Sequence, residues 1–303
     1  MNLRLIKILA GFGQLLAAAI WGFAFVVVKD SLNNIGPIWM VAIRFIIAAI
    51  LLAIVYQRKL KLIKKETWIK GIILGFFLGT AYITQTIGCK YTTAGKNAFL
   101  TTVYVVLIPL FSWVITKKRP QWYIFFCAIM SIVGIGLLAL KSDDASIINK
   151  GDVLTLICGI FFAIHIIFTS MYNQSEDPVI LTVLQFLFAA ILGWLCAPFL
   201  EGPLPIQNLL KVNVSISILY LALFSTLIAF LLQNVGLKFL PPTLSSLFLS
   251  FEAVFGVIFG AIILREYLTI RMIIGCILIF LAVFFSQIIP EINLKIKGDN
   301  KNY

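Results

Sequence analysis

Apolar runs of about 20 residues recur from one end of the chain to the other, and they limit the fold more than any other feature. A helix of that length crosses about 30 Å of hydrocarbon. In lipid the backbone must satisfy its own hydrogen bonds, so such a run forms a helix that spans the membrane. We predict an all-α integral membrane protein with about ten transmembrane helices, near residues 9–28, 37–56, 69–88, 95–116, 121–140, 152–171, 179–199, 214–235, 243–263 and 271–289.

Composition and charge fit the same class of protein. Of the 303 residues, 61% are hydrophobic and 12% are charged, far from the roughly 25% charged share of a soluble domain. The net charge of +12 does not indicate nucleic-acid binding, because the Lys and Arg residues lie at the ends of the apolar runs. With the N-terminus inside, 15 of them fall on the cytoplasmic side and eight fall outside. We expect a plasma (inner) membrane protein with both termini in the cytoplasm.

The chain contains an internal repeat. Residues 37–51 (PIWMVAIRFIIAAIL) align with residues 178–192 (PVILTVLQFLFAAIL) at an offset of about 141. Residues 85–91 (QTIGCKY) align with residues 233–239 (QNVGLKF) at an offset of about 148. We place the first five-helix repeat at 1–141, the second at 150–290 and a cytoplasmic tail at 291–303.

Five spans per repeat is an odd number, so the second copy enters the membrane upside down relative to the first. Inverted repeats of this kind are typical of secondary transporters, whose solute site lies near the bilayer midplane where the repeats meet. The sequence therefore predicts a solute site lined by both halves.

Several stretches carry a family resemblance. They are residues 18–25 (AAIWGFAF), 44–49 (RFIIAA), 88–101 (GCKYTTAGKNAFLT), 220–229 (YLALFSTLIA), 250–256 (SFEAVFG) and 264–266 (LRE). In this order and spacing the chain resembles the EamA-type members of the drug/metabolite transporter superfamily. The resemblance implies a basket of ten helices around a central cavity, which exports small metabolites such as amino acids. Trp21, within the first stretch, is a candidate cavity residue on this basis.

A polar stripe on the ninth span supplies the main candidates for the cavity. Ser245, Glu252 and Gly256 recur at helical spacing, which places them on one face. Their counterparts in the fourth span include Asn97, Thr101 and Tyr104. A carboxylate about ten residues into a span is costly, so we expect Glu252 to face the cavity or a partner. It can bind a substrate amine, exchange a coupling proton, or be satisfied by a neighbouring helix.

Five further polar residues lie inside spans. Gln85 and Gln233 are identical across the repeat and can bind a zwitterionic solute or join helices. Arg44 is interpreted as a structural charge that several acceptors satisfy, and its counterpart Gln185 is expected to matter less. His165, the only histidine, is a candidate cavity residue, although a satisfied buried side chain is the simpler interpretation.

The sequence argues against catalysis. An intramembrane enzyme needs a nucleophile with a base, a metal cluster or paired carboxylates. One histidine, five widely spaced cysteines and one clearly buried carboxylate supply none of these. We expect no enzyme, cofactor or metal site, with a receptor or scaffold that does not transport as the alternative function. The expected partners are a small solute, with protons as an optional coupling ion, and the lipid bilayer; a homodimer is compatible with the sequence.

Overall fold

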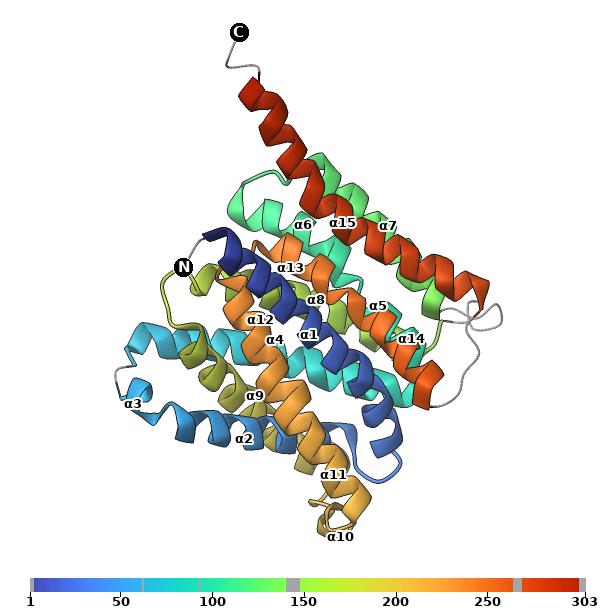
Figure 1. Ribbon diagram of the computed structural model, residues 1–303. Helices are drawn as coiled ribbons and strands as arrows, with labels where there is room; N and C mark the ends of the chain where they lie inside the picture. Colours follow the sequence, from blue (N-terminus) through green and yellow to red (C-terminus); the bar gives the residue numbers. More distant parts are fainter. Residues whose placement is uncertain (1–2, 62, 93, 140–147, 264–268, 300–303) are drawn as a thin grey trace.

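The regular structure is helical throughout the described part of the chain. The computed structural model describes residues 3–61, 63–92, 94–139, 148–263 and 269–299 (Figure 1). Its helices are α1 (Leu3–Ser31), α2 (Pro37–Val55), α3 (Gln57–Leu60), α4 (Lys65–Tyr91), α5 (Ala94–Thr101), α6 (Tyr104–Thr116), α7 (Trp122–Ala139), α8 (Lys150–Tyr172), α9 (Pro178–Glu201), α10 (Ile206–Leu209), α11 (Val212–Tyr220), η1 (Leu221–Ile228), α12 (Ala229–Leu237), α13 (Pro242–Leu249), α14 (Phe251–Ile263) and α15 (Ile270–Asp299).

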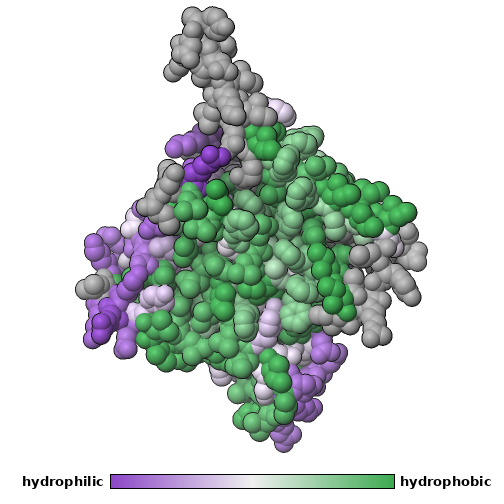
Figure 2. Space-filling model, in the orientation of Figure 1, coloured by the Kyte–Doolittle hydropathy of each residue, from purple (hydrophilic) through white to green (hydrophobic). Residues whose placement is uncertain are grey.

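Ten apolar helical segments match the ten predicted spans. Eight are long and apolar enough to cross a membrane, and two shorter apolar helices, Trp122–Leu137 and Ile270–Ser286, occupy the fifth and tenth places. Apolar side chains cover the middle of the face in Figure 2, and hydrophilic residues gather at its edges. The all-α membrane fold is therefore confirmed. The last helix, α15, continues past the predicted end of the tenth span to Asp299.

Two spans that the sequence predicted as continuous are divided at equivalent places. The fourth span breaks between α5 and α6 at Thr102 and Val103, and the ninth breaks between α13 and α14 at Ser250. Thr102 and Ser250 correspond across the repeat, and each hydroxyl donates to the carbonyl oxygen three residues earlier, at 2.7 Å. A hydroxyl bound in this way competes with the helical pattern of the backbone. Both spans therefore present helix ends inside the membrane, as discontinuous helices of transporters do.

The eighth span also departs from a regular α-helix. Its middle part, η1, is a π-helix, and the Thr226 hydroxyl donates to the carbonyl oxygen of Leu221, five residues earlier, at 2.8 Å. A π-helical turn holds about one more residue than an α-helical turn, and such turns are frequent at functional sites. Here it directs Ser225 and Thr226 toward α2.

Glycines bring the two repeats into close contact along α4 and α9. A Cβ atom on Gly71 would lie 2.9 Å from Leu184 Cδ1, and one on Gly75 would lie 2.9 Å from the carbonyl oxygen of Gln185. These distances are shorter than a side chain allows. Gly71 and Gly75 lie four residues apart and form a close-packing face, which joins the first repeat to the second.

Charged side chains link α3 and α4 to the connection between α8 and α9. Lys70 Nζ lies 2.5 Å from Glu176 Oε1, and Lys59 Nζ lies 2.6 Å from Asp177 Oδ2. Thr67 Oγ1 also donates to Glu176 Oε2, at 2.9 Å. The connection between α8 and α9 is thereby bound to the start of α4 and to α3.

This cluster predicts a stability that depends on pH. Burial raises the pKa of Glu176, but the hydrogen bonds from Lys70 and Thr67 outweigh it and hold the pKa below its usual value. Such a carboxylate stabilises the folded state above its unfolded pKa of about 4.3, and that contribution is lost as the pH falls through the folded pKa. We expect Glu176→Gln to lower the melting temperature most above about pH 5 and least below about pH 4. A difference that does not change with pH would contradict this role.

Candidate functional site

A central cavity lies where the two repeats meet. The space between its wall atoms measures about 610 Å³, a figure that includes the part open to solvent. Its walls come from α1, α2, α4, α5 and α6 in the first half of the chain and from α8, η1, α12, α13 and α14 in the second half. Seven of the nine predicted cavity residues line it: Trp21, Gln85, Asn97, Thr101, Tyr104, Gln233 and Glu252.

Glu252 and Tyr104 meet at the two breaks. Tyr104 Oη donates to Glu252 Oε1 at 3.3 Å, and both side chains are about 5% exposed or less. Tyr104 is the first residue of α6, and Glu252 lies in the first turn of α14. The N-terminal end of a helix carries partial positive charge, which favours a carboxylate there. The repeat thus places one acidic group beside a broken helix at the level of the cavity.

Arg44 supplies the positive charge of the cavity. Its guanidinium donates from Nε to Thr226 Oγ1 at 2.7 Å and from Nη2 to Ser225 Oγ at 2.8 Å. It also lies 4.8 Å from the centre of the Tyr82 ring. No carboxylate forms an ion pair with Arg44 among the described residues. The π-helix therefore holds the guanidinium in place, and its charge is not neutralised by the protein side chains described.

Amide and hydroxyl groups form the polar wall near α5. Gln85 Nε2 donates to Thr101 Oγ1 at 3.1 Å, and Asn97 Nδ2 donates to Thr155 Oγ1 at 2.8 Å. Among the described residues, Asn97 Oδ1 and Gln233 Oε1 have no hydrogen-bond partner, although both atoms are buried. A buried acceptor without a partner is costly, so both oxygens are suited to a donor on a ligand.

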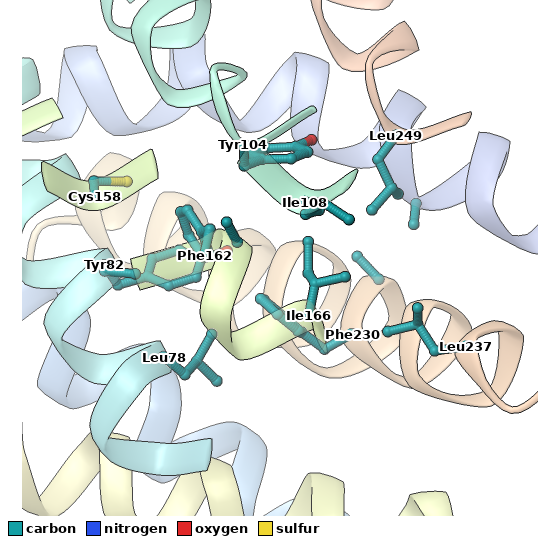
Figure 3. Packing of buried hydrophobic residues seen from close by; sticks show 14 of the residues in the cluster. Leu78, Tyr82, Tyr104, Ile108, Cys158, Phe162, Ile166, Phe230, Leu237 and Leu249 are labelled. Carbon is teal, nitrogen blue, oxygen red and sulfur yellow. The ribbon is translucent and has the colours of Figure 1, made fainter. Parts of the chain in front are cut away.

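Aromatic side chains that the sequence analysis missed complete the wall. Tyr82, Phe162 and Phe230 converge on the cavity from α4, α8 and α12, with ring centres 5.3 and 5.8 Å from Tyr82 (Figure 3). Tyr82 and Phe230 are repeat counterparts, and each lies three residues before one of the two predicted glutamines. Helical spacing places residues three apart on one face, so the repeat alignment contained a signal for both rings.

The two remaining predicted residues lie elsewhere. His165 does not line the cavity; its Nε2 is 2.7 Å from Gln185 Oε1 inside the helix bundle. Ser245 is fully buried near the start of α13 and is not part of the cavity wall either.

Replacing Arg44 tests whether this wall is structural. We expect Arg44→Ala to reduce the yield of folded protein severalfold, because it removes two charge-assisted hydrogen bonds of about 1.5–3 kcal/mol each. Fluorescence-detected gel filtration measures that yield. Gln185→Ala is the matched variant at the counterpart position. The sequence suggested that it does little, but its bond to His165 leads us to expect a loss of about 1 kcal/mol. A normal yield of Arg44→Ala with lost solute binding would place Arg44 against the solute instead.

The fold and its cavity define a multi-pass membrane protein of two inverted five-helix repeats. The EamA-like transporter family matches residues 8–140 and 149–287, and the chain belongs to this family. The resemblance drawn from the sequence motifs is thereby confirmed.

Relatives agree with this assignment, and a solved structure shares the fold. An uncharacterized transporter of Archaeoglobus fulgidus is 31% identical over 282 residues, which cover 93% of this chain and 87% of the relative. The uncharacterized transporter YoaV of Bacillus subtilis is 23% identical over 289 residues, 93% of this chain and 97% of the relative. A crystal structure described only as that of a protein matches 92% of this chain and 96% of its own with a TM-score of 0.74, at 16% identity. That likeness concerns the fold alone.

Proposed function

We propose that the protein is a secondary transporter that exports small organic metabolites such as amino acids by alternating access between its two repeats. The observation that carries this proposal is the cavity between the repeats, which has a cation, an anion and an aromatic wall at the level of two broken helices. Solute sites of inverted-repeat transporters lie at such breaks. One chain contains both repeats, so the mechanism does not require the homodimer that the sequence allows.

The charges of the cavity suggest a zwitterionic solute. A substrate ammonium group is matched by the Glu252 carboxylate and by the free acceptors of Asn97 and Gln233. A substrate carboxylate is matched by the Arg44 guanidinium, and Tyr82 and Phe230 provide surface for an apolar side chain. Proton coupling through Glu252 is the second role that this position supports. Few and well-placed polar groups among apolar walls are typical of small-molecule sites.

Counterflow in proteoliposomes tests the function directly. Vesicles loaded with an unlabelled amino acid, nucleoside or amine are diluted into the labelled compound, and transient accumulation reports exchange. We expect accumulation with at least one amino acid and none in protein-free vesicles. Correctly folded protein that exchanges no compound would favour a receptor or scaffold.

The orientation is proposed from the Lys and Arg asymmetry. In Figure 1 the start of α1, α3 and the end of α15 lie toward the upper and left edges, away from α10 at the bottom. If the start of α1, α3 and the end of α15 lie in the cytoplasm, the cavity extends from Glu252 toward the outer ends of α1 and α4. Val28 and Cys89 line it there.

Thiol labelling of intact cells tests this topology. We expect a membrane-impermeant maleimide to label Lys211→Cys and to leave Lys64→Cys unlabelled, because Lys211 precedes α11 on the outer side and Lys64 precedes α4 on the inner side. The wild type, with its five native cysteines, gives the background. Labelling of Lys64→Cys from outside would reverse the orientation. Asp144, in the predicted outer loop between the repeats, lies outside the described residues.

A further inference from the structure

Buried polar atoms without partners are unevenly distributed around the cavity. Among the described residues, such atoms on the side of the α8–α9 connection belong to Gln14, His165, Asn173, Gln185, Gln233, Asn234 and Ser245. On the opposite side of Glu252 the only comparable atom in the described chain is Asn97 Oδ1. We call the first group the polar seam. It leads from Gln233 in the cavity wall to Asn173 at the end of α8.

Hydrogen bonds within the seam determine which atoms remain free. Gln14 Nε2 donates to the carbonyl oxygen of Gln233 at 3.0 Å, and Asn173 Nδ2 donates to that of Asn234 at 2.7 Å. A carbonyl oxygen can only accept, so these bonds fix both amides with the nitrogen toward the backbone. Gln14 Oε1 and Asn173 Oδ1 are therefore left as acceptors. Buried acceptors are normally satisfied, which makes a run of unsatisfied ones unusual for a static core.

The repeat relates the seam to the open half of the cavity. Gln233 and Ser245 correspond to Gln85 and Asn97, which line the cavity. The helix crossings correspond as well. Thr155 Oγ1 of α8 lies 2.5 Å from where a Cβ atom of Gly88 would be, and Gln14 Nε2 of α1 approaches Gly236 in the same way. The closed side thus contains the counterparts of the polar groups that face the cavity on the open side.

Apolar side chains close the seam in this conformation. Ile166 and Leu249 line the cavity, and with Leu237 they gather where α8, α12 and α13 approach one another (Figure 3). Ser245 lies one turn before Leu249 on α13 and is fully buried. Beyond Gln233, which reaches the cavity wall, the seam is therefore closed by apolar packing, without a charged barrier among these residues.

We infer that the polar seam is the second half of the solute path, which opens toward the α8–α9 connection when the repeats exchange conformations. This inference rests on the proposed transport function. In that conformation Gln14 and Ser245 face water and the passing solute, as Gln85, Asn97 and Gln233 do in the present one. The seam offers mainly acceptors, so it suits a solute that presents hydrogen-bond donors, such as an ammonium group.

Sided thiol labelling tests the inference with two neighbouring serines. Ser245 and Ser246 are both fully buried in α13, but the Ser246 hydroxyl donates to the carbonyl oxygen of Thr243 at 2.9 Å, whereas that of Ser245 has no partner among the described residues. Ser245→Cys and Ser246→Cys are nearly isosteric changes. Sealed vesicles of both orientations are treated with a membrane-impermeant cationic maleimide, and mass spectrometry measures the modification of each peptide. Gln14→Cys serves as a second reporter within the seam.

We expect Ser245→Cys to react at least tenfold faster than Ser246→Cys, and only from the side of the α8–α9 connection. Equal rates, or reaction from the other side, would overturn the inference. A seam that merely holds static water excludes the maleimide and gives the first of these results. Counterflow on the same vesicles separates the two proposals. Transport without labelling rejects the seam alone. Labelling without any transport shows that the seam opens but rejects the proposed function, and with it the seam's role as a solute path.

Discussion

Glu252→Gln is expected to weaken solute transport ten- to a hundredfold while the protein stays folded. The substitution keeps the size and hydrogen-bonding groups of the side chain and removes its charge. Glu252 is 5% exposed in the cavity wall, at the start of α14. If the carboxylate binds a substrate ammonium group, the lost charge-assisted contact costs about 1.5–3 kcal/mol, which corresponds to that range of affinity. Counterflow at several solute concentrations measures it.

Tyr104→Phe is the matched control for this variant. It removes the hydroxyl that donates to Glu252 and leaves the charge in place, so we expect a smaller loss of affinity. A role in proton coupling predicts a different pattern, in which Glu252→Gln still exchanges solute but loses the pH dependence of transport. Wild-type kinetics of Glu252→Gln at every pH would remove this residue from the site.

Gly75→Ala is expected to abolish most of the folded protein. The added Cβ would come closest to Phe188 Cβ and would lie 2.9 Å from the carbonyl oxygen of Gln185 and 3.2 Å from the nitrogen of Ala189. None of these atoms can turn away, because two belong to the backbone of α9 and a Cβ atom is fixed by the backbone. The helices would have to separate along the contact that joins the repeats. Overpacking of this kind costs about 1–3 kcal/mol or more. The fraction of purified protein that stays monodisperse after heating measures the loss.

Gly13→Ala makes the same chemical change where the helices leave room. Its Cβ would lie 3.6 Å from Leu232 Cδ2, which is an ordinary contact. Alanine is favoured over glycine in a helix by up to about 1 kcal/mol, so we expect unchanged or slightly higher stability. Equal loss in both variants would show that the effect comes from helix propensity or insertion and not from the α4–α9 contact.

The candidate site was predicted best where helical periodicity and the repeat acted together. The stripe of Asn97, Thr101 and Tyr104 lies along the cavity because residues three and four apart share a helix face. The same rule failed for Ser245, although it belongs to the equivalent stripe of the ninth span. Periodicity predicts which face of its helix a residue occupies, but it does not predict which neighbouring helix packs against that face.

The sequence by itself determined that this protein spans a membrane and that its two repeats are inverted. Runs of about 20 apolar residues require helices that span a membrane, and an odd number of spans per repeat requires the second copy to be inverted. Both conclusions follow from chain length and backbone hydrogen bonding, which are local.

Only the tertiary structure decided where the polar side chains meet. Hydroxyl groups accompany each irregular helix. Those of Thr102 and Ser250 donate to backbone carbonyl oxygens at the two breaks, and that of Thr226 does so in the π-helix before Ala229. The hydrogen-bond partners of Arg44 lie about 180 residues away in sequence, in the π-helix η1. Contacts between distant helices depend on the packing of the whole bundle, because lipid solvates apolar faces of helices about equally well.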